Sequence, residues 1–301
     1  MKITTLIYKF LMGSLKIFPF KRQLFSAVKV VSTPGKGIRR DLKFNGPFTV
    51  ETNSVKFKMM NYDHPLHILE NDIFWLGLDV WEPVTSTLWI KLCKQSDVIM
   101  DIGANIGIFS LLAAATNPNS KIFGFEPIER TFNKYKKNIL INKFGAITAE
   151  NIALSDSDGV ADMYDFPDYT PLNATLTNVW HESDSGRKVI KIKTRRLDSY
   201  IADLKLNKID LIKIDVELHE PEVLYGMGKY LAEFQPTIVI EITTEIMWNR
   251  IMERFNKLDY LYFYIDELES KTLRKINSYE KFDGYNFLFC KSAVAKSLGI
   301  I

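Results

Sequence analysis

Cysteine is scarce in this sequence, and long hydrophobic runs are missing. The chain has only two cysteines, Cys93 and Cys290, which lie far apart and in no metal-like spacing. A disulfide framework is therefore excluded, and we expect a reducing compartment, the cytoplasm. No apolar run reaches the roughly 20 residues that a membrane-spanning helix needs. Because no small-residue cleavage site follows an apolar core, we predict no signal peptide either.

An overall excess of one charge is missing as well. The chain has 39 Lys and Arg against 36 Asp and Glu, which gives a net charge of +3. The whole chain thus has no nucleic-acid-binding signature, and we expect no nucleic-acid partner. With 47% hydrophobic residues among 301, the chain can bury a full core of one large α/β domain with extensions, or of two small domains.

Acidic residues are absent from the first 40 positions, which contain nine Lys or Arg. Lys2, Lys9 and Lys16 recur every seven residues and share one helical face, while apolar residues such as Leu6 and Phe10 crowd the others. Residues 1–40 therefore form a basic amphipathic arm. Two interpretations stay open: a helix on an anionic membrane surface, at the inner face of the membrane, or a helix packed on the domain with solvated lysines.

The rest of the chain divides into a lead-in region, residues 41–96, and a main domain, residues 97–301. The break "STPGKG" separates the arm from the lead-in, which begins with an extended, alternating piece around "FTVETNSVKFKM". A helix is predicted after Pro83, which suits a first-turn position. The residues with helical spacing there are Thr85, Leu88, Trp89 and Leu92.

The main domain alternates apolar strands with helices. The predicted strands are "VIMDIG", "KIFGFEP", "AITAENIALS", "IDLIKIDVE" and "TIVIEI", and the helical stretches include "RTFNKYKKNILIN" and "EPEVLYGMGKYLAEF". This alternation predicts parallel pairing with helices on both faces of the sheet. Two further β-rich pieces, "DYLYFYID" and "GYNFLFCK", predict an antiparallel C-terminal hairpin. We therefore predict an α/β fold with a doubly wound, Rossmann-like, mostly parallel sheet.

The loop after the first of these strands lacks one glycine of the dinucleotide fingerprint. Gly103 and Gly107 are present, but the middle glycine of G-x-G-x-x-G, which lets the backbone approach a pyrophosphate, is missing. Asp101 adds negative charge where a phosphate would be repelled. An acid with glycines suits a ligand that carries an ammonium and sugar hydroxyls but no phosphate. S-adenosylmethionine is such a ligand.

The second strand ends in Glu126, which is followed by Pro127. A carboxylate at this position can accept hydrogen bonds from both ribose hydroxyls at once. Because NAD-binding folds use the same device, Glu126 alone does not discriminate between the two cofactors. The alternative interpretation is an exposed strand-end glutamate.

Several motifs occur together in the order and spacing of a known family: "VIMDIGANIGIFSLLAA", "FEP", "NIALSDSDG" and "IDLIKIDVELHEPEVLYGM" followed by "PTIVIEI". Over residues 75–265 the chain resembles the FkbM family of S-adenosylmethionine-dependent methyltransferases, which has a class I Rossmann-like fold. The resemblance implies an O-methyltransferase domain acting on a sugar, glycan or related hydroxylated metabolite. Leu218 stands where family members usually carry glycine. Since leucine adopts a positive φ only at a cost, the geometry of that loop stays open.

The resemblance also implies the cofactor-binding residues. They are Asp101, Gly103, Ala104, Asn105, Gly107, Glu126, Asn151, Ile152 and Asp215. Asp101, Gly103 and Asn105 would line the methionine moiety, and Gly107 would let the first helix start close to its strand. Glu126 would bind the ribose.

The remaining members of this set have roles in the same resemblance. Asn151 and Ile152 would flank the adenine. Asp215 would lie nearest the methionine amino group and the transferable methyl.

Transfer to a hydroxyl needs a general base, because a sugar hydroxyl is a poor nucleophile until its proton leaves. The candidates are Glu217, His219 and Glu241, which follow or end the fourth and fifth strands. The two glutamates could instead cap a helix or orient the cofactor. His219 has an ordinary pKa near neutrality, but "HEPEV" also predicts a helix start with a solvated first-turn histidine. We predict no metal ligands.

The stretch from Asp165 to Gly186 is polar and aromatic and is a candidate for acceptor binding. Two alternatives to a methyltransferase stay open. One is a dinucleotide-dependent oxidoreductase, and the other is a non-catalytic Rossmann-like module that docks on membranes or partner enzymes. The oligomeric state is not predicted.

Overall fold

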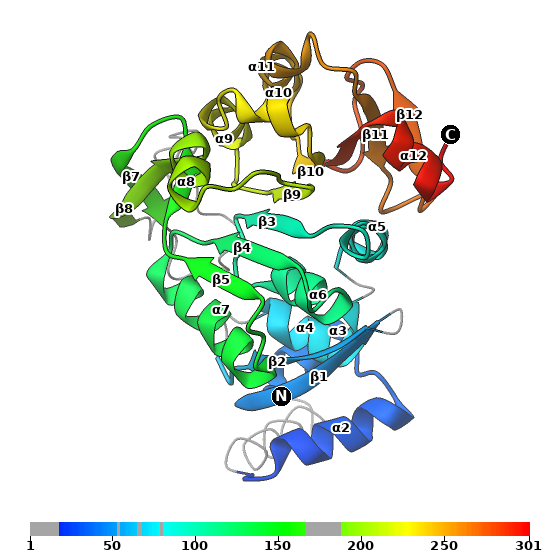
Figure 1. Cartoon of the computed structure of the whole chain (residues 1–301). Helices are drawn as coiled ribbons and strands as arrows, with labels where there is room; N and C mark the ends of the chain where they lie inside the picture. The colour runs from blue at the N-terminus through cyan, green and yellow to red at the C-terminus, as the bar shows by residue number, and fades with distance from the viewer. Residues whose placement is uncertain (1–17, 53–54, 65–67, 79–80, 166–187) are drawn as a thin grey trace.

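The structure is a computed structural model that describes residues 18–52, 55–64, 68–78, 81–165 and 188–301. Its centre is an eight-stranded sheet in the order β12-β11-β13-β10-β9-β3-β4-β5 (Figure 1). Five strands of this sheet run parallel to one another, as the alternation of strands and helices predicts. These are β3 (Val98–Ile102), β4 (Lys121–Phe125), β5 (Ile147–Glu150), β9 (Leu211–Ile214) and β10 (Thr237–Glu241).

The C-terminal part adds three strands at one edge. The predicted antiparallel pair is present as β11 (Leu261–Ile265) and β13 (Asn286–Cys290). Strand β13 also pairs antiparallel with β10, so it lies between β10 and β11. A third strand, β12 (Leu273–Ile276), pairs with the outer edge of β11. Strand β12 was not predicted from the sequence, because it lies in a lysine-rich stretch with few apolar residues.

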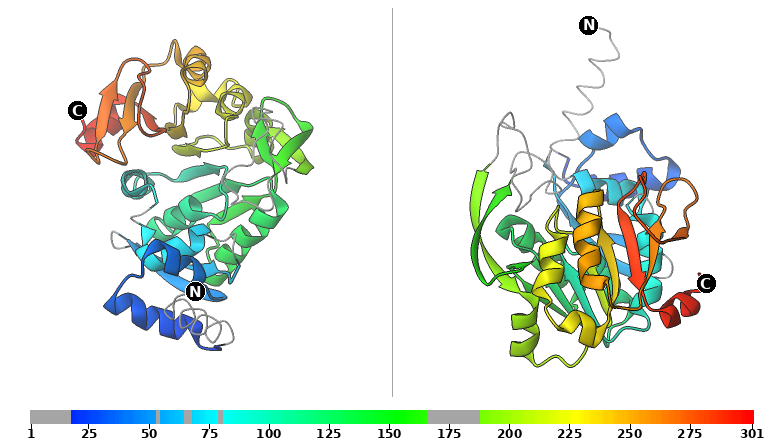
Figure 2. Two further views of the ribbon diagram at one scale, coloured as in Figure 1. Left: turned by 180° about the vertical axis from the view of Figure 1, so that it is seen from behind. Right: turned by 90° about the horizontal axis from the view of Figure 1, so that it is seen from above.

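Helices cover both faces of the sheet (Figures 1 and 2). Because the strands are buried on both faces, two large hydrophobic clusters flank the central sheet, with Trp89 and Leu111 in one and Ile212 and Trp248 in the other. The first cluster contains side chains of α5 (Pro83–Cys93), α6 (Ile108–Thr116), α7 (Glu129–Asn142) and α12 (Ser292–Leu298). The second contains side chains of α8 (Leu197–Leu204), α9 (Glu220–Gly226), α10 (Tyr230–Phe234) and α11 (Glu245–Phe255).

Two predicted elements are each divided in the structure. The stretch predicted as one helix over residues 220–234 is broken between α9 and α10, where Gly228 adopts a positive φ. The stretch predicted as one strand over residues 146–155 leaves the central sheet after β5. Its second half is β6 (Ala153–Ser155), which pairs with β8 (Lys188–Arg196).

A separate three-stranded sheet, ordered β6-β8-β7, therefore lies beside the central one. Strand β7 (Gly159–Asp165) pairs antiparallel with β8. Figure 2 shows this small sheet at the opposite side of the molecule from the C-terminal strands. Residues 166–187, which include most of the predicted acceptor-binding stretch, lie outside the described residues.

The lead-in region packs on the main domain rather than apart from it. Its alternating piece is an antiparallel hairpin of β1 (Gly46–Thr52) and β2 (Val55–Asn61). The backbone N–H of Met60 donates to the Asn138 side chain on α7 at 2.9 Å, which ties the hairpin to the domain. The predicted helix after Pro83 is confirmed as α5, and its four predicted apolar-face residues are buried.

The described part of the arm forms two helices. The helices α2 (Lys21–Val31) and α3 (Lys36–Asp41) flank the predicted break, and α4 (Ile68–Leu76) follows the hairpin. Residues 1–17, with the predicted lysine face, lie outside the described part of the chain. Within the described ranges, no helix is both long enough and apolar enough to cross a membrane.

Candidate active site

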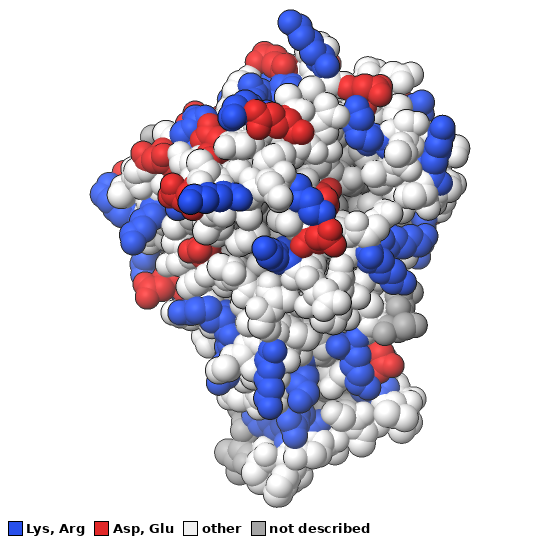
Figure 3. All heavy atoms as spheres, in the orientation of Figure 1, with Lys and Arg blue, Asp and Glu red and all other residues white. Residues whose placement is uncertain are grey.

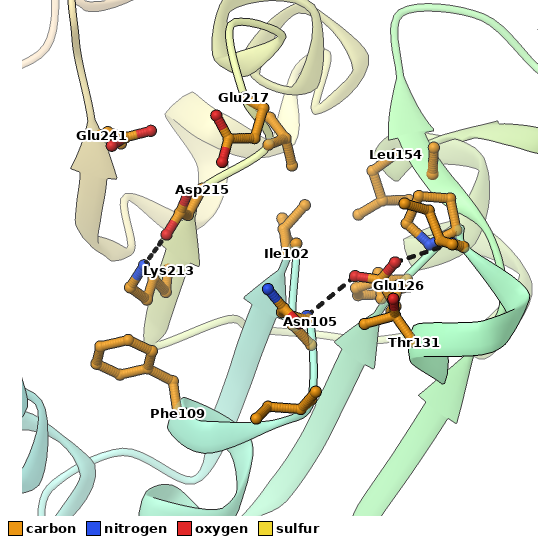
Figure 4. Close-up of a pocket in the computed structure, with 18 of the residues that line it drawn as sticks. Ile102, Asn105, Phe109, Glu126, Thr131, Leu154, Lys213, Asp215, Glu217 and Glu241 are labelled. Carbon is orange, nitrogen blue, oxygen red and sulfur yellow. Dashed lines mark hydrogen bonds and ion pairs between the residues drawn. The ribbon is translucent and has the colours of Figure 1, made fainter. Parts of the chain in front are cut away.

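One cavity lies at the carboxyl ends of β3, β4, β9 and β10, where an open α/β sheet binds its ligand (Figure 4). Its volume is about 280 Å³. Ile102 and Glu241 line it from the ends of β3 and β10. The lead-in region also contributes to its wall, with Leu69, Trp81 and Glu82. The lead-in therefore completes the site, a role that its sequence pattern did not predict.

The loop between β3 and α6 requires glycine at two places. Gly103 has φ +83°, and a Cβ on it would lie 1.8 Å from the carbonyl oxygen of Asp215. Gly107 has φ +90°, and its Cβ would lie 2.1 Å from the Tyr135 ring. Only glycine fits such close approaches. The position of Gly107 agrees with its predicted role, because α6 begins at the next residue.

Ala104 and Asn105 line the cavity in the same loop. Asn105 has φ +51°, in the left-handed region. Its side-chain oxygen is buried and has no hydrogen-bond partner within the described structure. A buried acceptor without a protein partner is available to accept a hydrogen bond from a bound ligand.

Glu126 is buried at the end of β4, with 6% of its surface exposed, and it lines the cavity. Its carboxylate accepts hydrogen bonds from the backbone N–H of Asn105 at 3.0 Å and of Ile128 at 2.9 Å. Burial raises the pKa of Glu126 to about 7, although these two donors oppose the shift. Glu126 is thus not the exposed strand-end residue of the alternative interpretation. Each carboxylate oxygen keeps a second lone pair for a ligand hydroxyl.

Asp101 and Asn151 lie outside the cavity lining, in contrast to the expectation. The Asp101 carboxylate, 2% exposed, accepts hydrogen bonds from the backbone N–H and the hydroxyl of Ser110, at 2.8 and 2.6 Å. It therefore holds the start of α6. The Asn151 side chain donates to the backbone carbonyls of Glu126 and Pro127 and lines a neighbouring depression. Both residues shape the site through its backbone, whereas Ile152 lines the cavity as expected.

Three carboxylates face the other end of the cavity: Asp215, Glu217 and Glu241 (Figure 4). Asp215 is paired with Lys213, whose Nζ lies 2.7 Å from its carboxylate. Lys213 is 2% exposed, and its Nζ also lies 4.4 Å from the centre of the Phe109 ring. Lys213 was not among the predicted site residues, although a charged residue inside the apolar strand "LIKID" is a signal for a buried ion pair.

This cluster is electrostatically strained because carboxylates outnumber cations. Burial, followed by the charges of Asp215 and Glu220, raises the pKa of Glu217 to about 8. Burial next to Asp215 and Glu217 also raises the pKa of Glu241. Burial alone would lower the pKa of Lys213, but the charges of Asp215 and Glu82 outweigh it and raise that pKa above its ordinary value. A cationic ligand would relieve this repulsion.

The backbone is strained at the same end. Glu217 has φ +55° and Leu218 has φ +76°, so two consecutive non-glycine residues adopt the left-handed conformation. The loop therefore has a geometry that glycine usually adopts, with leucine in its place, at a cost of about 1–3 kcal/mol per residue. The buried Glu220 carboxylate accepts a hydrogen bond from the Val216 backbone N–H at 3.0 Å and closes this turn.

His219 lies at the N-cap of α9, so the helix start predicted from "HEPEV" is confirmed. It also lines the cavity and is not a solvated side chain. Its Nε2 lies 2.9 Å from the Ser155 hydroxyl, and its Nδ1 lies 3.6 Å from Glu222. Burial lowers the pKa of His219, although the charges of Glu222 and Asp156 oppose the shift.

The residues of the cavity fit S-adenosylmethionine better than a dinucleotide. Carboxylates lie at both ends, and Lys213 is the one Lys or Arg among the described residues that line the cavity. Carboxylates suit the hydroxyls and the ammonium of this cofactor, while a diphosphate would meet repulsion. In the described ranges, no group of three or more His, Cys, Asp or Glu is arranged to hold a metal ion.

Comparisons with known proteins agree with this fit. The family model of the methyltransferase FkbM domain matches residues 101–262. Methyltransferase 1 of Beauveria bassiana is 27% identical over 159 residues, which cover 48% of this chain and 64% of the relative. The 31-O-demethyl-FK506 methyltransferase FkbM of Streptomyces tacrolimicus is 29% identical over 163 residues, which cover 44% of this chain and 60% of the relative. The hexuronic acid methyltransferase AglP of Haloferax volcanii is 30% identical over 152 residues, which cover 50% of this chain and 59% of the relative.

The chain thus matches less than two thirds of the length of these relatives. The family model, in contrast, covers more than half of the chain itself and includes the glycine loop, Glu126 and the acidic cluster. The chain belongs to the FkbM family of S-adenosylmethionine-dependent methyltransferases.

Proposed function

We propose that this protein transfers a methyl group from S-adenosylmethionine to a hydroxyl oxygen of a sugar, a glycan or a related hydroxylated metabolite. The observation that carries the proposal is that one cavity joins the glycine loop and Glu126 to the carboxylates Asp215, Glu217 and Glu241. The names of two relatives, a hexuronic acid methyltransferase and a 31-O-demethyl-FK506 methyltransferase, support a hydroxylated acceptor. We also propose that the protein acts in the cytoplasm, at the inner face of the membrane.

Residues at the two ends of the cavity would hold the cofactor. When bound, S-adenosylmethionine supplies an electrophilic methyl group on a sulfonium. Glu126 would accept hydrogen bonds from the ribose hydroxyls with its remaining lone pairs, and Asp215 would pair with the ammonium. Asn105 would contribute its unpartnered side-chain oxygen. The apolar Ile152 and Leu154 would flank the adenine.

The acceptor hydroxyl has to give up its proton to a base beside the reacting atoms. Among the three candidates we favour Glu217, because it faces the cavity from a loop and its pKa of about 8 makes it a stronger base than an ordinary carboxylate. Glu241 lies in the same acidic group and would share the proton. Burial lowers the pKa of His219, which favours the neutral ring, but its Nε2 already contacts the Ser155 hydroxyl.

Lys213 is a positioning residue in this scheme. It is buried beneath Asp215, and its ion pair fixes that carboxylate toward the cavity. Holding the methyl donor and the hydroxyl in line supplies much of the rate, up to about 7–11 kcal/mol in favourable intramolecular reactions. A small displacement of Asp215 would therefore reduce turnover.

The cofactor assignment is tested by calorimetry with Glu126→Ala. We expect the Kd for S-adenosylmethionine to rise about 10- to 100-fold, because hydrogen bonds to a charged group are lost. Glu129→Ala, an exposed glutamate outside the cavity, is the matched control and should leave the Kd unchanged. An unchanged Kd for Glu126→Ala would contradict the assignment. A rise of the melting midpoint with NAD or NADP, but not with S-adenosylhomocysteine, would favour an oxidoreductase.

The reaction is tested with labelled S-adenosylmethionine and hydroxylated acceptors or a cell-envelope extract. We expect labelled product from the wild type and little from Glu126→Ala. Mild alkali then separates the possible products, because it cleaves a methyl ester of a uronic acid but leaves a methyl ether intact. Alkali-stable label supports transfer to a hydroxyl, whereas alkali-labile label would show transfer to a carboxylate.

A further inference from the structure

Helix α2 turns its cationic side chains toward the protein. Lys21 forms an ion pair with Asp63, and the Lys29 ammonium donates to the backbone carbonyl of Phe74. The Arg22 guanidinium donates to the carbonyl of Pro47 at 3.2 Å. The buried Phe25 lies between these contacts, against Phe44 and Trp75, with ring centroids 6.4 and 5.8 Å away. The cations thus anchor α2 to the body of the molecule.

The opposite side of α2 is apolar and exposed. Phe20, Leu24, Ala27 and Val31 follow the spacing i, i+4, i+7, i+11, so they form one stripe along the helix. Val30 lies beside this stripe. The exposed fractions are 58% for Phe20, 37% for Leu24 and 87% for both Val30 and Val31. A surface helix of a globular protein ordinarily has the reverse arrangement, with its apolar stripe toward the core.

Exposed apolar side chains are concentrated in this part of the molecule. Among the described residues, fourteen large hydrophobic side chains are exposed, and six of them lie between Phe18 and Ile38. The other eight are scattered over distant elements, as is normal for a soluble protein. A concentrated apolar surface marks an interaction site.

Positive charge surrounds this apolar surface. Residues 18–41 contain six Lys or Arg and a single acid, Asp41. Lys36 and Arg40 on α3 are exposed, as is Lys58 on β2. Figure 3 shows Lys and Arg side chains gathered over the lower end of the molecule, above the white underside formed by α2, with little acidic surface between them.

We propose that α2 docks this end of the protein on an anionic lipid bilayer, with the stripe of Phe20, Leu24, Ala27 and Val31, together with Val30, inserted among the acyl chains. The helix protrudes as a ridge at the end of the molecule (Figure 1). A bilayer accepts an apolar ridge of any outline and attracts the surrounding cations, whereas a protein partner needs a complementary groove. Methyl transfer would then take place beside the membrane.

The docking mode differs from both interpretations of the basic arm. Three basic residues of α2 make contacts with the body of the molecule, so they are not the main membrane contact. Insertion depends on the apolar stripe, while the exposed Lys36, Arg40 and Lys58 supply attraction to anionic headgroups. Deletion of residues 1–40 is a poor test, because it would uncover Phe44 and Trp75. Point substitutions on the stripe leave these contacts intact.

The test is co-sedimentation of the full chain with vesicles of phosphatidylcholine, alone or mixed with phosphatidylglycerol. We expect the wild type to bind the mixed vesicles, and less so as the salt concentration rises. The double variant V30E/V31E should lose on the order of tenfold or more in partitioning, because it removes two inserted side chains and adds repulsion from the headgroups. Its binding of S-adenosylhomocysteine should not change.

The matched control is V160E/V189E, which replaces two exposed valines of β7 and β8 with the same change in charge. It should retain vesicle binding. Equal binding of V30E/V31E and wild type would overturn the proposal, as would an equal loss in both double variants. Absence of vesicle binding by the wild type would overturn it too. A Val30- and Val31-dependent self-association in solution would then show that the ridge contacts another copy of the chain.

Discussion

The two ends of the candidate cavity differ in how well their charges are compensated. At the Glu126 end, both carboxylate oxygens accept a backbone N–H, and the glycine loop packs closely around them. At the Asp215 end, several carboxylates line the cavity, and Lys213 is the single Lys or Arg that lines it within the described ranges. There the pKa of Glu217 rises to about 8, and both Glu217 and Leu218 have positive φ. The Glu126 end is thus held by backbone donors, although burial still raises the pKa of Glu126 to about 7, whereas the Asp215 end is left strained.

This difference separates binding from chemistry. A carboxylate with fixed backbone donors is pre-oriented and recognises a neutral diol with little rearrangement. A crowded acidic group has unfavourable repulsion in the free protein, which a cation reduces on binding. Strained and poorly compensated positions are typical of functional sites. We therefore propose that the Glu126 end recognises the ribose, and that the Asp215 end binds the ammonium and faces the transferable methyl and the acceptor.

The largest expected effect comes from breaking the contact between the two ends. In Gly103→Ala the new Cβ would meet the Asp215 carbonyl oxygen at 1.8 Å, in a backbone conformation that alanine disfavours. We expect a loss of about 2–4 kcal/mol in the free energy of unfolding. The affinity for S-adenosylmethionine should fall about 100-fold or more, since both carboxylate groups are displaced. Chemical denaturation and calorimetry measure the two effects.

Gly145→Ala is the control for this substitution. A Cβ on Gly145 would have no neighbour within 4 Å, and the φ of Gly145 is not positive. The control variant should keep both the wild-type stability and the wild-type affinity. If Gly103→Ala behaved in the same way, the close approach of the glycine loop to β9 would not organise the site.

The Glu126 end of the cavity is also the end that could be predicted from the sequence. Glycines at a strand–helix turn and an acid before proline are local signals, so Gly103, Gly107 and Glu126 were placed correctly in the loop and at the strand end. Local signals do not show where a side chain points. Asp101 was therefore expected in the cavity, although Ser110 binds it beneath α6.

The strained end depends on contacts between distant segments, which pattern analysis does not predict. Glu82 comes from the lead-in region and approaches Lys213, 131 positions later, to 4.0 Å. Lys213 lies within a strand that was predicted to be apolar and buried, so it was not considered as a site residue. Similarly, β12 was not predicted, because it forms only by pairing with β11. The parallel pairing of the five strands was predicted from the sequence, whereas the charge balance at their ends was not.

The next largest effect tests the strained end alone. Glu217→Gln should lower kcat by about 100- to 10,000-fold if Glu217 is the general base, with little change in the Kd for S-adenosylmethionine. In the wild type kcat/KM should rise with pH up to about 8, where Glu217 loses its proton. The variant should lose this dependence. A pH–rate profile for both proteins is the measurement.

Three companion variants sharpen this test. Glu241→Gln and His219→Asn examine the other two candidates, and Glu233→Gln changes an exposed glutamate on α10 as a control. If His219→Asn abolished turnover and Glu217→Gln did not, the base would be the histidine. If Glu241→Gln had the largest effect, Glu241 at the end of β10 would be the base that takes the proton.

The smallest expected effect concerns the stability of the ligand-free protein. Burial beside other carboxylates raises the pKa of Glu241 above its ordinary value, and the same holds for Glu217. The folded protein therefore binds these protons more tightly than the unfolded chain. Their contribution to stability is present at low pH and is lost as the pH rises from about 4.5, to about 8 for Glu217 and to about 10 for Glu241. Glu241→Gln removes one such group, so its Tm at pH 8 should exceed that of the wild type by about 2–5 °C. The difference should vanish near pH 4.5, where both proteins are protonated at this cluster. A Tm difference that was equal at both pH values would show that the glutamine acts through packing, and the acidic group would then not be strained.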